Sequence, residues 1–267
     1  MCRLSLFLAV VSAAAALADE PEFDRKPLSA WTRQLGAGSV AERREAAGAL
    51  RYFGPSALPA LDALVAALKD TDAQVRENAA DALWRIGTEA RAKAVPALMP
   101  LLADKASAVR YVAAVAVWRL SGRSERVVPV LGALLERDNP SRLRAAWTLG
   151  EIGPEAKATL PALTALLRDA DPHARIHAAF ALWQVGMQSK QGVAVLIEAL
   201  KSDDYHVRRS AAHTLRHFGP AGRDAIPELV RASDDPDPGL RALAEAALER
   251  VRPPRKEATR EIAVRKQ

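Results

Sequence analysis

The sequence predicts an all-α solenoid, and three observations lead to this class. One short pattern recurs through nearly the whole chain, Ala occurs 56 times in 267 residues, and aromatic residues make up only 5%. Ala has the highest helix propensity of the amino acids, so this composition argues against a β sandwich or barrel. A pattern that keeps one period of about 20–50 residues is typical of stacked repeats rather than of separate globular domains.

The repeat is clearest at an Arg that is followed by small apolar residues. The spacings between successive copies are 33, 34, 32, 33, 33 and 33 residues. These positions are Arg43, Arg76, Arg110, Arg142, Arg175, Arg208 and Arg241. Seven copies at one period predict about seven stacked helix pairs.

The second helix of each copy carries the repeated Arg. In the second copy, Val75, Ala79, Leu83 and Ile86 follow helical spacing and define one buried side. An Asp or Ser four residues before the Arg is expected to cap the helix. These expected caps are Ser39, Asp72, Asp138, Asp171, Asp204 and Asp237.

A Gly eleven residues after the Arg is expected to end the same helix, because Gly adopts the left-handed conformation of a helix C-terminus. The glycines at this position are Gly54, Gly87, Gly153, Gly186 and Gly219.

The first helix of each copy is apolar and contains a Pro in its early part, as in Val95-Pro96-Ala97-Leu98. In the incomplete first copy, Leu28, Trp31 and Leu35 are expected to form this helix. In the last copy Glu245 replaces a buried Ala, which is typical of a solvent-facing terminal repeat.

These patterns resemble the HEAT repeat family, in its bacterial HEAT-like form (the phycobilisome-lyase type). The carriers are the Pro-Ala-Leu…Leu-Leu…Asp first helix and the Val-Arg…Ala-Ala…Ala-Leu…Ile-Gly second helix, over about residues 27–252. The resemblance implies a right-handed, curved superhelix in which the second helices line the concave side.

The resemblance also implies an Asp in the turn, six residues before the Arg. Asp70, Asp104, Asp169 and Asp235 match, Glu136 is a near match, and Ala37 and Ser202 depart from the pattern. The repeated Arg lies on the packed side of its helix, where a charge must be paired. We therefore interpret the seven arginines as a structural ladder, bound to the turn Asp and to backbone carbonyls, rather than as a basic binding surface.

The chain begins with the pattern of a secretory signal peptide over residues 1–18. Arg3 is followed by an apolar run of about 14 residues and by the small-x-small site Ala16-Leu17-Ala18. This run is shorter than the ~20 residues that span a bilayer. We expect cleavage before Asp19, export to the periplasm or the exterior, and no membrane attachment afterwards. The only cysteine, Cys2, would be removed with the signal peptide.

The sequence thus divides into a signal peptide (1–18), a short linker (19–26), the repeat solenoid (27–252) and a basic tail (253–267). The net charge is +6, and the tail carries much of it through Arg255, Lys256, Arg260, Arg265 and Lys266. Because the body of the protein is nearly balanced in charge, the high pI is weak evidence for nucleic-acid binding, and no nucleic-acid partner is expected.

The side of the second helices opposite the packed side is the candidate binding surface. In copies four to six it carries Trp147, Phe180 and all five histidines. The residues proposed to bind a partner are Arg144, Trp147, His177, Phe180, His213 and His217. An aromatic cluster on a face expected to be open indicates a binding patch.

Packing is the competing interpretation of these aromatic residues. Trp84, Trp118 and Trp183 share one register, which is typical of contacts between repeats. For Trp147 and Phe180 the two interpretations stay open, and if these side chains bind, their truncation is expected to spare the fold. With an ordinary pKa near ~6.5, the histidines would gain charge between about pH 7 and pH 5.5 and would strengthen binding of an acidic partner.

The histidines also give a metal-binding alternative. His173 and His177 are one helical turn apart, as are His213 and His217, and such pairs can share an ion. No Glu follows any of these histidines, whereas the HEAT-like deoxyhypusine hydroxylases hold iron with His-Glu pairs. The HEAT-like bilin lyases share the repeat but would act in a different compartment from an exported protein.

The sequence therefore predicts a non-enzymatic scaffold that binds a protein or peptide on its concave surface, as a monomer and without a cofactor. It has no Gly-rich phosphate loop and no Gly-x-Ser-x-Gly motif. The alternative is a metal- or cofactor-dependent HEAT-like enzyme, of the hydroxylase or lyase type, that uses the histidines of copies five and six.

Overall fold

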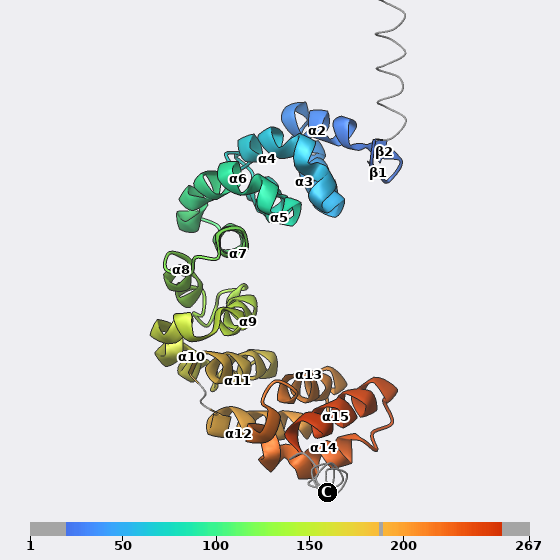
Figure 1. The fold of residues 1–267 in the computed structure, drawn as a ribbon, viewed down its shortest axis with the longest axis vertical. Helices are drawn as coiled ribbons and strands as arrows, with labels where there is room; N and C mark the ends of the chain where they lie inside the picture. Colours follow the sequence, from blue (N-terminus) through green and yellow to red (C-terminus); the bar gives the residue numbers. More distant parts are fainter. Residues whose placement is uncertain (1–19, 187–188, 253–267) are drawn as a thin grey trace, which may run out of the picture. The chain divides into compact units, whose positions relative to one another are not determined.

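The computed structural model describes residues 20–186 and 189–252, and this part of the chain is almost entirely helical (Figure 1). It contains the seven helix pairs that the repeat predicts, which confirms the all-α solenoid. The predicted signal peptide and the basic tail lie outside the described residues. Within the described ranges, every helix is too short or too polar to cross a membrane.

The chain divides into two compact units near residue 130. The N-terminal unit holds the strands β1 (Glu22–Phe23) and β2 (Lys26–Pro27) and short 3-10 helices at Arg51–Ala60, Thr88–Ala90 and Met99–Ala103. Its α-helices are α2 (Leu28–Ala37), α3 (Val40–Leu50), α4 (Leu61–Ala67), α5 (Ala73–Ile86), α6 (Arg91–Leu98) and α7 (Ser107–Ser121). Helix α8 (Val127–Ala133) contains the division itself.

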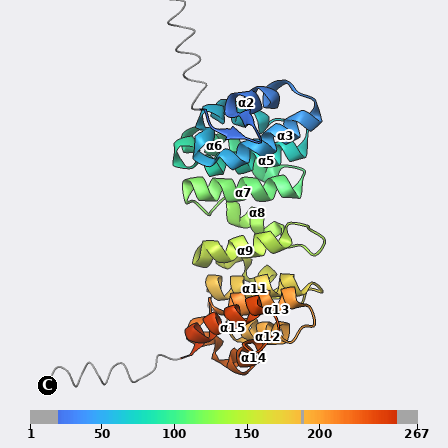
Figure 2. The same ribbon diagram turned by 90° about the vertical axis from the view of Figure 1, so that its right-hand side faces the viewer.

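The C-terminal unit continues the same alternation. Its helices are α9 (Arg142–Ile152), α10 (Leu160–Leu166), α11 (Pro172–Gly186), α12 (Ser189–Leu200), α13 (Tyr205–Leu215), α14 (Ile226–Ala232) and α15 (Pro238–Val251), with 3-10 helices at Gly153–Thr159 and Gly219–Ala225. The second helices α9, α11, α13 and α15 pack side by side in chain order (Figure 2). This layer positions the candidate site.

The apolar side of each helix pair is buried by stacking. Leu28, Trp31 and Leu35 form the buried side of α2, as the sequence predicts for the first copy. In the second helices small residues such as Ala79, Ala80 and Ala145 are completely buried. Because an Ala side chain is a single methyl group, neighbouring helices can approach closely along these positions.

The expected caps are confirmed at five of the six positions. Ser39 forms a capping box with Glu42, and the expected aspartates of the other four helices accept hydrogen bonds from first-turn N–H groups at Gln74, His173, His206 and Leu240. Asp138 is wrong, because α9 begins only at Arg142 after Ser141. Asn139 precedes Pro140, and a residue before Pro is disfavoured in the helical conformation.

The expected terminating glycines are confirmed at Gly87 and Gly153, which directly follow α5 and α9 and have positive φ. Gly54 and Gly219 also have positive φ, but α3 and α13 end four residues earlier, at Leu50 and Leu215, and short 3-10 turns follow them. Gly186 differs from Gly87 and Gly153, because it is itself the last residue of its helix, α11. Gly122, one residue later in its copy than the others, also adopts the left-handed conformation and ends α7.

The segment expected to be a linker contributes a small hairpin. Glu22 pairs with Pro27, and Phe23 pairs with Lys26, in an antiparallel ladder. Phe23 stacks on Tyr52 with ring centroids 4.6 Å apart. The hairpin therefore packs on the first repeat by aromatic contact rather than extending away from it.

Candidate functional site

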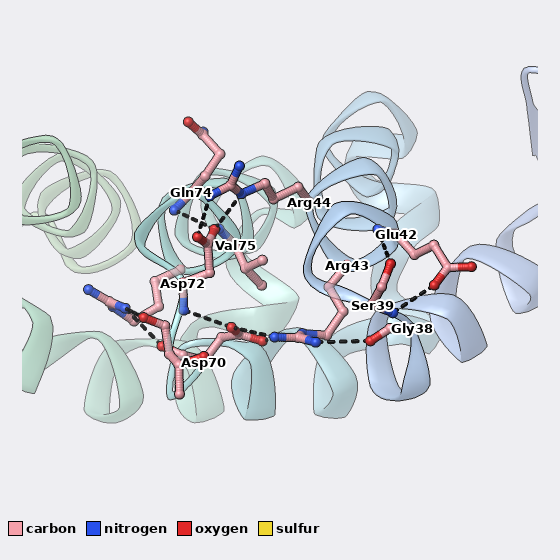
Figure 3. A network of polar contacts seen from close by, with 11 residues as sticks. Gly38, Ser39, Glu42, Arg43, Arg44, Asp70, Asp72, Gln74 and Val75 are labelled. Atoms are coloured by element: carbon pink, nitrogen blue, oxygen red, sulfur yellow. Dashed lines mark hydrogen bonds and ion pairs between the residues drawn. The ribbon is translucent and has the colours of Figure 1, made fainter.

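Arg43 of α3 shows how the repeated arginine is used (Figure 3). Its Nε and Nη2 donate to the two carboxylate oxygens of Asp70 at 2.6 and 3.1 Å, and its Nη1 donates to the Gly38 carbonyl at 2.9 Å. The hydrogen bond from Arg43 lowers the pKa of Asp70 below its ordinary value. Since Asp70 stands in the turn of the next copy, this ion pair joins neighbouring repeats.

The same guanidinium group also closes the turn before its own helix. In five copies its Nη1 donates to the carbonyl six residues earlier, at 2.7 to 2.9 Å. These pairs are Arg76 to Asp70, Arg110 to Asp104, Arg175 to Asp169, Arg208 to Ser202, and Arg241 to Asp235. The turn Asp therefore has two functions. Its carbonyl accepts from the Arg of its own copy, and its carboxylate accepts from the Arg of the preceding copy.

The departure of Ser202 from the turn pattern has a visible consequence. Arg175 donates to the carbonyls of Asp169 and Ala170, but among the described residues it has no carboxylate partner. Arg142 contacts Asp169 and Asp171 only at 3.4 Å, and its buried Nε has no hydrogen bond in the described part of the chain. The ladder is therefore weaker in the C-terminal unit than at Arg43.

In the second copy, the side opposite the packed side is occupied by a polar network. Arg51 of the preceding copy donates to Asp81 and to Asn78. Asp81 also accepts from the Trp84 indole N–H at 2.7 Å and from Arg85 at 3.0 Å. Asn78 is buried, at 7% exposure. These polar groups serve contacts between helices within the N-terminal unit.

The equivalent side in the C-terminal unit is aromatic. Trp147 of α9 stacks on Phe180 of α11, with ring centroids 4.2 Å apart and planes 14° apart. The expectation that Phe180 lies open to a partner is wrong, because its exposure is 2%. Gly150 of α9 leaves the space for it, since a Cβ there would lie 2.6 Å from Phe180 Cε1. Phe180 is thus a packing residue, whereas Trp147 is half-buried.

Three imidazoles lie next to the Trp147 indole. Their ring centroids lie 5.8 Å (His177), 6.4 Å (His213) and 6.2 Å (His217) from that of the indole. His213 and His217 are exposed, and His177 is half-buried. The sequence placed these residues on one face, and the structure brings them into one cluster around Trp147.

A cavity of about 610 Å³ opens beside this cluster, on the layer of second helices. Its lining residues are Trp147, His173, His177, His206, Arg209, Ser210, His213, Thr214 and Leu243. Three of the six proposed residues therefore line the cavity, namely Trp147, His177 and His213. Arg144 is exposed on the same helix as Trp147. Sequence reasoning missed Arg209 and Thr214, because they fall between the two sides that helical periodicity separates. It also missed Leu243, which has the same position in the last copy as His177 in its own.

The half-buried His177 has a defined hydrogen-bonding state. Its Nδ1 lies 2.9 Å from the Leu143 carbonyl oxygen, and since a carbonyl only accepts, Nδ1 is the donor. In the neutral ring Nε2 is then an acceptor. Burial lowers the pKa of His177, although the Leu143 hydrogen bond opposes this effect.

The pKa values of the two exposed histidines of the cluster are shifted in the same direction as that of His177. Partial burial lowers the pKa of His213 and of His217, and the charge of Arg216 adds to both shifts. The expectation of ordinary pKa values is therefore corrected for three histidines. They gain their charge at lower pH than an isolated imidazole does.

The pairs proposed for metal binding do not form a complete ligand set. His213 and His217 lie near each other, with ring centroids 5.5 Å apart, and His173 lines the same cavity as His177. Within the described residues, no group of three His, Cys, Asp or Glu side chains is placed to hold a metal ion.

Trp183 packs between repeats, as its register indicates. Its indole N–H donates to the His217 carbonyl at 2.9 Å, and its ring stacks on Phe218 at 5.3 Å. The rings of Trp84 and Trp118 lie beneath the guanidinium groups of Arg85 and Arg119, at 5.0 and 4.5 Å.

The fold and the ladder of ion pairs define an α-solenoid of stacked helix pairs. The family model of HEAT repeats matches residues 28–118, 61–150, 95–170 and 160–249. The chain therefore belongs to the HEAT repeat family. No curated protein matches it significantly.

Several solved structures are similar in fold. One is the complex of CpcE and CpcF of phycocyanin lyase from Nostoc sp. PCC7120, with 24% identity, a TM-score of 0.58, and coverage of 92% of this chain and 94% of that chain. An engineered protein has 25% identity, a TM-score of 0.51, and coverage of 84% and 68%. The AP-3 complex has 17% identity, a TM-score of 0.53, and coverage of 85% and 51%.

Proposed function

We propose that this protein is a non-enzymatic scaffold that binds a protein or peptide on the second-helix face of its C-terminal unit. The observation that carries the proposal is the cavity of about 610 Å³ beside Trp147. A pocket of roughly 300–1,000 Å³ with apolar walls and a few polar groups is typical of a ligand site. Here the walls include an indole, four imidazoles and a guanidinium group.

Packing alone does not explain the composition of this face. The core of the C-terminal unit contains completely buried aliphatic residues such as Leu149, Leu163 and Ile176. His206, His213 and Arg209 are exposed, and Trp147 is half-buried. Aromatic and Arg side chains contribute most often to binding hot spots. We therefore assign contact with the partner to Trp147, with Arg144, His177, His213 and His217 beside it.

Phe180 has a different role in this proposal. It lies under the Trp147 ring and against Gly150, at 2% exposure. From there it holds the indole at the edge of the cavity without touching the partner itself.

We also propose that the protein is exported, so that its partner would be a periplasmic or extracellular protein. The support is the sequence of residues 1–18, with one Arg, an apolar run and a small-x-small site. N-terminal sequencing of protein isolated from its own host tests this. A chain that begins at Asp19 would support export, and one that keeps Met1 or Cys2 would overturn it.

The binding proposal is tested by capture of partners from the host with four forms of the chain. These are the parent, Trp147→Ala, His213→Ala and the control Trp84→Ala, which removes a half-buried Trp from the N-terminal unit. A partner held by the parent and the control but weakened by about tenfold in the other two would support the site. Equal capture by all forms with unchanged helical signal would place binding elsewhere.

The alternative, a metal- or cofactor-dependent enzyme, is distinguished from a scaffold by elemental analysis and absorption spectroscopy of protein purified from its host. A stoichiometric metal or a bound chromophore that is lost in His173→Ala or His213→Ala would favour it. The similarity to the phycocyanin lyase complex, at 24% identity, supports a shared fold rather than a shared reaction.

A further inference from the structure

We infer that the cavity recognises an acidic segment of its partner polypeptide, with a carboxylate at Arg209 and an apolar side chain against Trp147. This inference rests on the proposed function, and it names the chemistry of the partner. It is carried by the charges of the lining residues and by the position of Arg209.

The lining combines one permanent positive charge with several polar side chains. It contains one guanidinium group, four imidazoles and the hydroxyls of Ser210 and Thr214, and among the described residues that line it there is no Asp or Glu. A ligand with a positive charge would therefore find no counter-charge in the wall. A carboxylate would find donors from α13 through Arg209 and Ser210.

Arg209 is available for such a contact, unlike the neighbouring ladder arginine. Arg208 binds the carbonyls of Ser202 and Asp203 and pairs with Asp235 at 3.2 Å. Arg209 is exposed, and within the described ranges it forms no ion pair. A guanidinium group can bind a carboxylate through two parallel N–H groups, which gives direction as well as charge.

The position of Arg209 is limited by the neighbouring helix. A Cβ on Gly239 of α15 would lie 3.2 Å from Arg209 Cζ, so the guanidinium group rests against the first turn of α15. This contact spans the step from α13 to α15 and keeps the charged group at the edge of the cavity. A Cβ at position 239 would shift the guanidinium group by a few tenths of an ångström.

Aspartates cap three of the second helices around the cavity. Asp171, Asp204 and Asp237 cap α11, α13 and α15, and each accepts from an N–H of the first turn at 2.6 to 2.9 Å. None of the three lines the cavity. Capping does not prevent an ion pair, since Asp72 caps α5 and also binds Arg44. Asp237 Oδ1 lies near Arg209, because both are 3.2 Å from the same Cβ position on Gly239, but no ion pair joins them in the described part of the chain. Arg209 can therefore still bind a carboxylate of the partner.

The size of the cavity favours a peptide over a free anion. A volume of about 610 Å³ exceeds what a single carboxylate fills. Trp147 and Leu243 offer apolar surface on α9 and α15, on the same wall as the polar donors on α13. An acidic residue next to an apolar one in an extended segment would use both kinds of surface.

The test is selection of a random peptide library on the purified chain, followed by affinity measurements with the most enriched peptide. A second synthetic peptide carries Asn or Gln in place of every Asp and Glu. Each is titrated by fluorescence anisotropy against the parent, Arg209→Gln, Arg209→Lys and Trp147→Ala. The matched control is Arg231→Gln, an exposed Arg on α14 that pairs with Glu228 within its own helix.

We expect enrichment of Asp and Glu, and a loss of about tenfold or more in affinity for Arg209→Gln and for the neutral peptide. Arg209→Lys should lose less affinity than Arg209→Gln, because it keeps the positive charge. The control Arg231→Gln should bind the peptide as tightly as the parent. Competition by millimolar acetate or phosphate as strong as that by the peptide would assign the site to small anions and overturn the peptide inference.

Two further outcomes separate this inference from the function on which it rests. Neutral or basic peptides that bind, lose affinity in Trp147→Ala and ignore Arg209→Gln would overturn the acidic partner and keep the binding face. An absence of enriched peptides, or binding that ignores both Trp147→Ala and Arg209→Gln, would count against the binding face itself.

Discussion

Trp147 and Phe180 occupy the same position in successive repeats and stack face to face, with ring centroids 4.2 Å apart. One of them is half-buried and the other is 2% exposed. Two residues at the same position of the repeat thus have different roles, because packing against the neighbouring repeat determines which side chain is buried.

Truncation of Phe180 to Ala should lower the free energy of unfolding by about 3–5 kcal/mol, as for a buried aromatic residue. A chemical denaturation series measures this loss.

Gly150→Ala should destabilise the C-terminal unit although Ala is the better helix former. The new Cβ would lie 2.6 Å from Phe180 Cε1 and 3.1 Å from the Ala181 Cα. Overpacking of this kind costs about 1–3 kcal/mol. Gly36→Ala in α2 is the control, because nothing lies within 4 Å of its Cβ, and it should be neutral or stabilising. Thermal melts of both variants check the pair, and equal melting temperatures would contradict the close approach.

Leu149→Ala should cost about 2–5 kcal/mol, because it opens a cavity in the core. Leu149 is completely buried. Val230→Ala removes an exposed side chain from the same unit, at 41% exposure, and should change stability by less than about 0.5 kcal/mol. Urea denaturation followed by circular dichroism measures both. A midpoint for Leu149→Ala that matches the parent would show that the packed side is assigned wrongly.

Asp104→Asn should cost about 2 kcal/mol, because it removes one partner of a nearly buried ion pair. Arg76 donates to both carboxylate oxygens, at 2.8 and 2.9 Å, and the two side chains are 8% and 10% exposed. The exposed pair of Lys93 with Asp62 is the control. Asp62→Asn should have almost no effect, so similar losses in both variants would argue against the ladder as a link between repeats.

The same aspartate predicts a response to acid. Burial would raise the pKa of Asp104, but the hydrogen bonds from Arg76 and from the Ala106 N–H outweigh it, so the net shift is downward. A carboxylate with a lowered pKa stabilises the fold above its unfolded-state value of 3.8, and this contribution is lost as the pH falls below that value. The melting temperature should therefore fall less steeply below about pH 4 for Asp104→Asn than for the parent.

Mild acid should destabilise the C-terminal unit through His177. Burial lowers its pKa below the ordinary 6.5, so the unfolded chain binds the proton more readily than the folded chain. The stability from the neutral ring is complete above pH 6.5 and is lost as the pH falls through the lowered pKa. Melting temperatures measured between about pH 7 and pH 5 should fall less steeply for His177→Gln. The exposed His206→Gln serves as the control.

Local rules explain what the sequence could determine. Helix starts at Asp72, Asp204 and Asp237 follow from one side chain and the next few N–H groups. The period of the repeated Arg gives the number of helix pairs, because each pair buries its apolar side on its neighbours. The exception at Asp138 is also local, since the Asn139-Pro140 step delays α9.

Contacts between repeats decided the rest. The sequence indicates that Arg76 must be paired, but only the packing of successive copies shows that the carboxylate belongs to Asp104 of the next turn. Likewise, Phe180 is covered because Gly150 lets its ring approach α9, and Arg209 reaches the cavity because Gly239 of α15 leaves room for it. Helical periodicity describes one helix at a time, whereas the burial of a side chain and the partner of a charge depend on the distance to the neighbouring helix.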